Sequence, residues 1–132
     1  MTASIVTSVY NWPQALELVL LSAKRQTVLP KEVIVADDGS RDDTRELIDR
    51  MRPEMPFPLI HVWQEDKGFR LARAANQAFA RCTGDIIIQI GGDIIMERHF
   101  VEDHLRHSER GYYLSGSRRK LTTKMNDKFF AR

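Results

Sequence analysis

Short apolar runs alternate with segments of helical periodicity along most of the chain. Val33, Ile34 and Val35 follow one another without a polar break, which is typical of a parallel strand covered on both faces. Elsewhere apolar residues recur at helical spacing, as Leu16 and Leu20 do. The pattern predicts strands at 4–9, 32–36, 59–63 and 85–90, a candidate fifth strand at 112–115, and helices at 13–23, 41–51, 71–80 and 99–107.

The alternation of strands and helices predicts an α/β fold, with a mostly parallel twisted sheet, helices on both faces and right-handed crossovers. Open sheets of this kind bind ligands at the carboxyl ends of their strands. Polar residues gather at those ends in this chain. They are Tyr10 and Asn11, Asp37 and Asp38, Lys67 and Gly68, and Asp93.

The helix starts carry ordinary capping signals. Asn11 precedes Pro13, and Ser40 precedes Asp42 and Asp43. Asparagine and serine side chains accept hydrogen bonds from the first helical N–H groups, and acids in the first turn favour the positive end of the helix dipole. We therefore expect Asn11 and Ser40 to act as N-caps.

The composition is that of a globular protein. Its 132 residues predict one domain, and 42% hydrophobic with 29% charged residues argue against disorder. The single cysteine, Cys82, excludes an intramolecular disulfide and gives no support to a zinc site. No apolar run approaches the ~20 residues that span a bilayer, and no basic region precedes the first strand as in a signal peptide. We expect a cytoplasmic location.

Charge is unevenly distributed along the chain. Residues 1–105 hold 12 basic and 16 acidic side chains, whereas residues 106–132 hold 8 basic and 2 acidic ones. We expect an α/β domain at 1–117 and a basic tail at 118–132, which is either solvated or in peripheral contact with an anionic membrane surface. Nucleic acid is disfavoured as a partner, because no aromatic residues are interleaved with the basic ones as a stacking platform.

Carboxylates at strand ends are the main candidate chemistry. Neither a GxxxxGK[ST] loop nor a GxGxxG motif is present. Asp37 and Asp38 are candidate substrate-binding residues, because ionised carboxylates accept hydrogen bonds from a base or ribose. Asp93 can hold a divalent cation whose shell is completed by water and substrate phosphates. The alternative is that all three acids only form turns.

Four segments, in this order, resemble family 2 glycosyltransferases. They are the opening strand at 4–11, the second-strand signature at 35–44, the segment Gly68 to Asn76, and the stretch 88–93, where an acid–any–acid metal motif would stand. The resemblance covers residues 4 to about 104. It is specific as an ordered set, although each segment alone is weak. The stretches 64–76 and 99–104 look most similar to a bacterial subgroup with a galactosyltransferase-like second half.

This resemblance implies the nucleotide-sugar-binding half of a GT-A fold. It implies that Asp38 accepts a hydrogen bond from the uracil of a UDP-sugar, with Thr7 and Tyr10 beside the base. It implies that Arg73 and Asn76 position the ribose or the diphosphate. The implied reaction is inverting transfer of the sugar to a saccharide acceptor, as in polysaccharide biosynthesis, and this chain would supply the donor-binding portion.

Two departures from the family pattern concern the metal and the catalytic base. The resemblance implies that Asp93 binds Mn²⁺ or Mg²⁺ at the diphosphate, but Gly91 stands where the family has its first metal-motif acid. We therefore expect a weakly held ion. The family's base, which deprotonates the acceptor hydroxyl, lies beyond this length, so we assign no catalytic residue.

Two other functions remain open at this point. A non-catalytic module that binds a nucleotide or serves assembly is favoured by Gly91. An NDP-sugar nucleotidyltransferase would need a glycine-rich basic loop after the first strand, which 8–11 does not supply. His99, His104 and His107 could form a metal cluster, but surface or capping roles are the expectation.

Overall fold

The structure is a computed structural model that describes residues 1–116. Four parallel strands form one sheet in the order β3-β2-β1-β4. The strands are β1 (Ala3–Val9), β2 (Glu32–Asp37), β3 (Leu59–Trp63) and β4 (Ile86–Ile90). The helices are α1 (Pro13–Lys24), α2 (Asp42–Met51), the short 3₁₀ helix η1 (Arg52–Glu54), α3 (Leu71–Phe79) and α4 (Phe100–His107).

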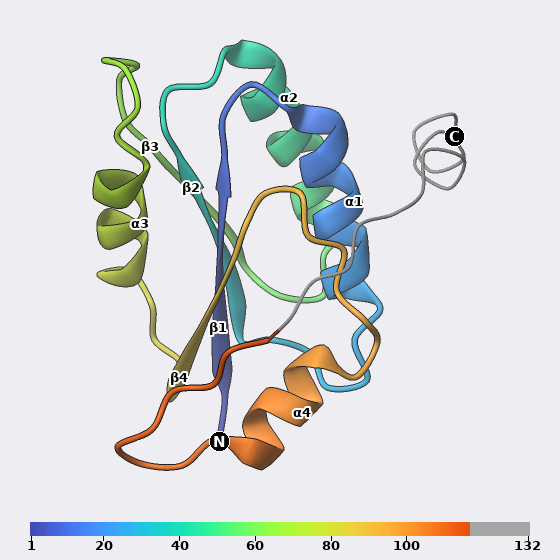
Figure 1. Cartoon of the computed structure of the whole chain (residues 1–132). Coiled ribbons are helices and arrows are strands. Elements are labelled where there is room, and N and C mark those ends of the chain that lie inside the picture. Colours follow the sequence, from blue (N-terminus) through green and yellow to red (C-terminus); the bar gives the residue numbers. More distant parts are fainter. Residues whose placement is uncertain (117–132) are drawn as a thin grey trace, which may run out of the picture.

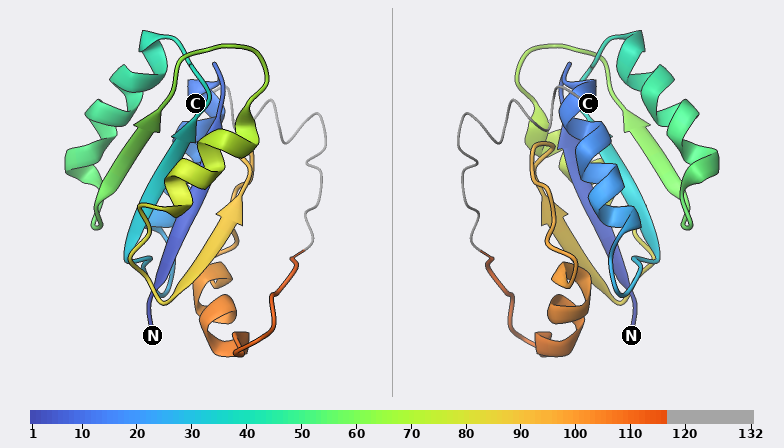
Figure 2. Two further views of the ribbon diagram at one scale, coloured as in Figure 1. Left: turned by 90° about the vertical axis from the view of Figure 1, so that its left-hand side faces the viewer. Right: turned by 90° about the vertical axis from the view of Figure 1, so that its right-hand side faces the viewer.

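Helices cover both faces of the sheet, with α1 and α2 on one face and α3 on the other (Figures 1 and 2). Because successive side chains of a strand point to opposite faces, the sheet contributes residues to two apolar cores, one on each face. The larger core packs β-strand residues such as Ile5 and Val33 against Leu16 and Leu20 of α1 and Ile48 of α2. The smaller core packs the other face against alanines of α3. The predicted fold class is confirmed.

The predicted fifth strand at 112–115 is wrong. Within the described residues, β4 pairs only with β1, and the segment after α4 forms no strand. Tyr112 donates its N–H to the carbonyl of Glu109 in a turn, and Tyr113 is 91% exposed. Two tyrosines and a leucine give this segment β propensity. A strand also needs a neighbouring strand to pair with and a face of the protein to pack on, and propensity supplies neither.

The predicted N-caps are also wrong. Neither α1 nor α2 has a side-chain cap hydrogen bond. Instead, Ser40 Oγ accepts the N–H of Asn11 at 2.9 Å, and Asn11 Oδ1 accepts the N–H of Arg41 at 2.8 Å. The two polar side chains therefore join the loops after β1 and β2 to each other. Asp42 and Asp43 do lie in the first turn of α2, as expected.

No helix within residues 1–116 is long and apolar enough to cross a membrane. The basic tail at 118–132, its expected membrane contact and the domain boundary at 117 lie outside the described residues.

Candidate functional site

A cavity of about 360 Å³ opens at the carboxyl ends of the strands. The chain moves from β1 to β2 to β3 in one direction and then returns to place β4 on the other side of β1. Such a switch point leaves a crevice in which open α/β sheets bind ligands. The lining residues come from the end of β1 and from the segments that follow each of the four strands: Ser8, Val9, Tyr10, Trp12, Asp38, Asp66, Gly68, Phe69, Leu71, Gly92 and Asp93.

Asp38 lines this cavity although only 3% of its surface is exposed. Its Oδ1 accepts a hydrogen bond from Gln64 Nε2 at 2.7 Å, and its Oδ2 accepts one from the N–H of Arg70 at 2.8 Å. An ionised carboxylate has about four acceptor positions, so both oxygens can accept a further bond. The carboxylate thus holds the loop between β3 and α3 and keeps acceptor capacity for a ligand.

Tyr10 and Gly39 hold that loop from the other side. The Tyr10 hydroxyl donates to Asp66 Oδ2 at 2.8 Å. This hydrogen bond raises the pKa of the Tyr10 phenol, because deprotonation would set a phenolate against a carboxylate. Gly39 has φ +89°, and a Cβ there would lie 2.5 Å from main-chain atoms of Asp66. The loop therefore rests directly on the turn that follows β2.

Asp93 reaches the cavity because the end of β4 lies close against the end of β1. A Cβ on Gly92 would overlap the carbonyl oxygen of Ser8, so this approach requires glycine. A Cβ on Gly91 would lie 3.1 Å from Asp93 Oδ1, which places position 91 beside that carboxylate. Within residues 1–116 no three histidine, cysteine, aspartate or glutamate side chains gather as a metal site, so the histidine-cluster alternative finds no support there.

Asp37 and Thr7 do not line the cavity. Asp37 is buried under the turn, where Oδ1 accepts the N–H of Ser40 at 2.8 Å and Oδ2 lies 2.7 Å from His61 Nε2. Thr7 is fully buried and donates its hydroxyl to the carbonyl of Gly91 at 3.2 Å. Both side chains support the loops of the site from behind rather than facing its cavity.

Arg73 and Asn76 lie on α3 with exposed side chains, outside the cavity lining. Arg73 Nη1 donates to Gln64 Oε1 at 3.4 Å, so it contacts the residue that binds Asp38. Contacts of Arg73 and Asn76 with ribose or diphosphate stay predictions.

Three residues of this site were not predicted from the sequence. Gln64 and Asp66 fix the loop, and Phe69 stands at the cavity rim. The sequence feature that could have identified them is their position after the third strand, at the same edge of the sheet as Asp38. A single sequence does not show that Gln64 and Arg70 reach back to Asp38 across 26 and 32 residues.

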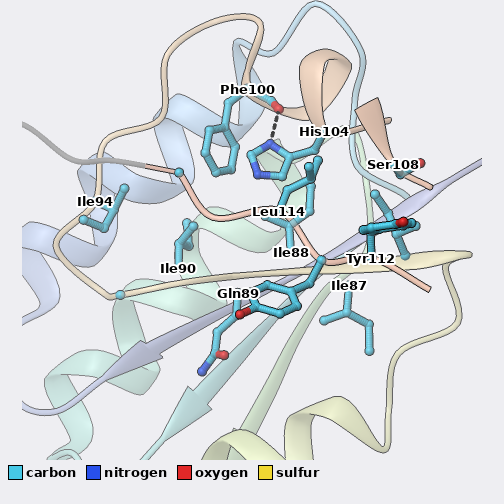
Figure 3. A pocket seen from close by; sticks show the side chains of 14 residues that line it. Ile87, Ile88, Gln89, Ile90, Ile94, Phe100, His104, Ser108, Tyr112 and Leu114 are labelled. Atoms are coloured by element: carbon cyan, nitrogen blue, oxygen red, sulfur yellow. Dashed lines mark hydrogen bonds between the residues drawn. The ribbon is translucent and has the colours of Figure 1, made fainter. Parts of the chain in front are cut away.

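A second cavity of about 580 Å³ runs along β4, between α4 and residues 112–116 (Figure 3). Its walls include Ile87, Ile88, Tyr112 and Leu114, and it contains no predicted substrate-binding or metal-binding residue. His104 lies in its wall with Nδ1 bonded to the carbonyl of Phe100 at 2.8 Å (Figure 3). Although this cavity is larger, it lacks the converging carboxylates of the first, so we place the functional site at the switch point.

The family model described as glycosyl transferase family 2 matches residues 4–130. The chain belongs to this family. Among curated relatives, YfnE of Bacillus subtilis, named an uncharacterized glycosyltransferase, is 32% identical over 110 residues, which are 83% of this chain and 27% of YfnE. The validoxylamine A glucosyltransferase of Streptomyces hygroscopicus subsp. limoneus is 32% identical over 108 residues, covering 77% of this chain and 22% of that enzyme.

Solved structures of glycosyltransferases share the fold of this family member. TarS 1-349 of S. aureus, solved with UDP, gives a TM-score of 0.71 at 23% identity, covering 80% of this chain and 31% of TarS. The mannosyltransferase PcManGT of Pyrobaculum calidifontis, solved with GDP-Man and Mn²⁺, gives 0.69 at 25% identity, covering 79% and 31%. The chain thus spans less than a third of the length of these relatives and structures.

Proposed function

We propose that this chain forms the donor-binding portion of an inverting, metal-dependent glycosyltransferase that moves a sugar from a UDP-sugar to a saccharide acceptor. The observation that carries the proposal is Asp38, a buried carboxylate with spare acceptor capacity in the cavity at the switch point. Family membership and the UDP bound to TarS support the choice of a nucleotide sugar.

Uracil suits this cavity because its edge carries one N–H between two carbonyl oxygens. Asp38 accepts the N–H, and Tyr10 borders the base from the end of β1. Thr7 anchors the end of β4 from behind through the carbonyl of Gly91. Arg73 and Asn76, outside the base cavity on α3, are assigned to the ribose and diphosphate.

The charge of the cavity fits a divalent ion. Its described lining contains Asp38, Asp66 and Asp93 but no lysine or arginine, so every charged side chain that lines the cavity carries the same sign as a diphosphate. Mg²⁺ and similar ions bind through one or two carboxylates together with substrate phosphates, and Asp93 offers one such carboxylate. An ion held by Asp93 would stabilise the negative charge that develops on the departing UDP.

In the proposed reaction, the acceptor hydroxyl oxygen forms a bond to the anomeric carbon as the bond from that carbon to the diphosphate oxygen breaks. The bonding electrons leave with UDP, and the hydroxyl proton passes to a general base. Direct displacement of this kind inverts the anomeric centre. Asp38 accepts hydrogen bonds from Gln64 and Arg70, and Asp66 accepts one from Tyr10. Asp93 is assigned to the ion, so no described residue of the cavity is assigned as the base.

Changing Asp38 to alanine tests this proposal. UDP affinity should fall by about 1–3 kcal/mol, the usual cost of removing one partner of a buried hydrogen bond. Calorimetric titration with UDP measures the change. Asp42→Ala, which removes an exposed acid of α2 outside the cavity lining, serves as the matched control and should bind UDP like the unmodified chain. Equal UDP affinity in Asp38→Ala would show that Asp38 is only a turn residue.

The purified 132-residue chain should bind UDP and transfer no sugar. A general base must lie within hydrogen-bond reach of the acceptor hydroxyl, and no described residue of the cavity is assigned that role. Incubation with a panel of UDP-sugars and saccharide acceptors, followed by measurement of released UDP, checks this. Acceptor-dependent release would refute the assignment and direct attention to Glu102 and Asp103 of α4.

Gly91 favours one second candidate, a non-catalytic nucleotide-binding module. Such a module would bind UDP with little dependence on a divalent ion, because Gly91 leaves the ion site without its first acid. In the proposed enzyme, Asp93 and the diphosphate hold the ion, and UDP affinity depends on it. UDP affinity measured with and without Mn²⁺ separates the two.

A further inference from the structure

Phe69 stands at the rim of the switch-point cavity with 90% of its surface exposed. An exposed phenylalanine contributes little to the core, since the hydrophobic effect rewards only apolar surface removed from water. Tyr10 and Trp12 line the same cavity and are also about half exposed, at 52% and 47%. The cavity mouth therefore presents three aromatic side chains that have apolar surface left to cover.

The loop that carries Phe69 is fixed on both sides. The next residue, Arg70, donates its N–H to Asp38 at 2.8 Å, and Asp66 accepts the Tyr10 hydroxyl at 2.8 Å. Between these anchors, Gly68 takes φ +83°, and nothing lies within 4 Å of the Cβ position there. Phe69 thus lies at the exposed tip of the loop, next to Arg70, whose N–H binds the Asp38 carboxylate.

The chemistry around Phe69 favours a planar, uncharged ring as its partner. A base that offers its N–H edge to Asp38 leaves both of its faces free, and aromatic side chains stack on bases through those faces. The diphosphate is a poor partner here, because the lining is acidic and Phe69 has no donor.

We propose that Phe69 stacks on the nucleobase of the donor, so that Phe69 contributes affinity for the base and Asp38 selects it. This inference rests on the proposed function, since it requires a nucleotide in the cavity. It predicts that removing the ring weakens the binding of every ligand that contains the base, with or without a sugar, and leaves the binding of the phosphates alone unchanged.

The test compares four proteins by calorimetry in the presence of Mn²⁺: the unmodified chain, Phe69→Ala, Phe69→Trp and Tyr113→Ala. Tyr113 is the matched control, because it is 91% exposed and lies at the other cavity. Phe69→Ala should weaken UDP binding by about 5- to 150-fold, the range for loss of one base–aromatic stack. Its affinity for inorganic pyrophosphate should not change. Phe69→Trp and Tyr113→Ala should bind UDP like the unmodified chain.

Two results would overturn the role of Phe69 while leaving the proposed function intact. The first is equal UDP affinity in the unmodified chain and Phe69→Ala. The second is an equal loss for UDP and pyrophosphate, which would mean a displaced loop. Failure of the unmodified chain to bind UDP would overturn the proposed function itself, and the stacking role with it.

Discussion

Replacing Gly39 with alanine is expected to destabilise the chain by about 2–5 kcal/mol and to abolish UDP binding. A left-handed backbone costs an alanine about 1–2 kcal/mol, and overpacking adds about 1–3 kcal/mol. Gly39 has φ +89°, and its added Cβ would lie 2.5 Å from main-chain atoms of Asp66. Relief of that overlap moves the loop away from Tyr10 and Asp38. Urea unfolding and UDP calorimetry measure the two effects.

Gly111→Ala is the matched control for this variant. Gly111 has a similar φ of +86°, but nothing lies within 4 Å of its Cβ position, and it is outside the cavity. This variant should show only the backbone cost of about 1–2 kcal/mol and bind UDP normally. If Gly39→Ala lost no more stability than Gly111→Ala and bound UDP equally well, the close approach of Asp66 would have no role in forming the site.

Gly91→Asp is expected to raise the affinity of the UDP-bound chain for Mn²⁺ by about 10- to 100-fold, the usual effect of one supporting group at a metal site. A Cβ added at position 91 would lie 3.1 Å from Asp93 Oδ1, so the new carboxylate stands beside the existing one once the Asp93 side chain shifts slightly. Gly91 is not among the residues with positive φ, so its backbone accommodates aspartate. Calorimetric titration of Mn²⁺ into UDP-bound protein measures the gain.

Gly91→Asn separates charge from size, because asparagine has nearly the shape of aspartate without its charge. It should give a smaller gain in Mn²⁺ affinity than Gly91→Asp. Equal affinity in the unmodified chain and Gly91→Asp would mean that position 91 does not face the ion. That result would also weaken the assignment of Asp93, since both positions were inferred from one motif.

The fold was predictable because strands and helices leave local patterns. The apolar run at Val33 to Val35 identified a buried parallel strand, and helical spacing identified α1. Errors arose where the partner of a group lies far away in the sequence. Asn11 and Ser40 have the capping chemistry expected of them, but they bond across the loops after β1 and β2. The tyrosines after α4 have β propensity but no strand to pair with in the described chain.

The site was predictable only in part, for a similar reason. Asp38 and Asp93 follow strand ends, and the topology of an open sheet brings such ends together. Asp37, one residue earlier, belongs to β2, and its side chain contacts His61 of β3 beneath the turn. The sequence of two adjacent acids does not reveal which of them faces the cavity. Phe69 reaches the cavity because Gly39 lets the loop approach, which depends on contacts between distant segments.

UDP is expected to bind in the cavity at the switch point. Backbone amide NMR shifts, recorded as UDP and Mg²⁺ are titrated into the ¹⁵N-labelled chain, test it most directly because they also report on the second cavity. We expect the largest shifts at Tyr10, Asp38, Phe69 and Gly92, around the carboxyl ends of the strands. Shifts confined to residues along β4 and the segment after α4, or no shifts at all, would contradict it.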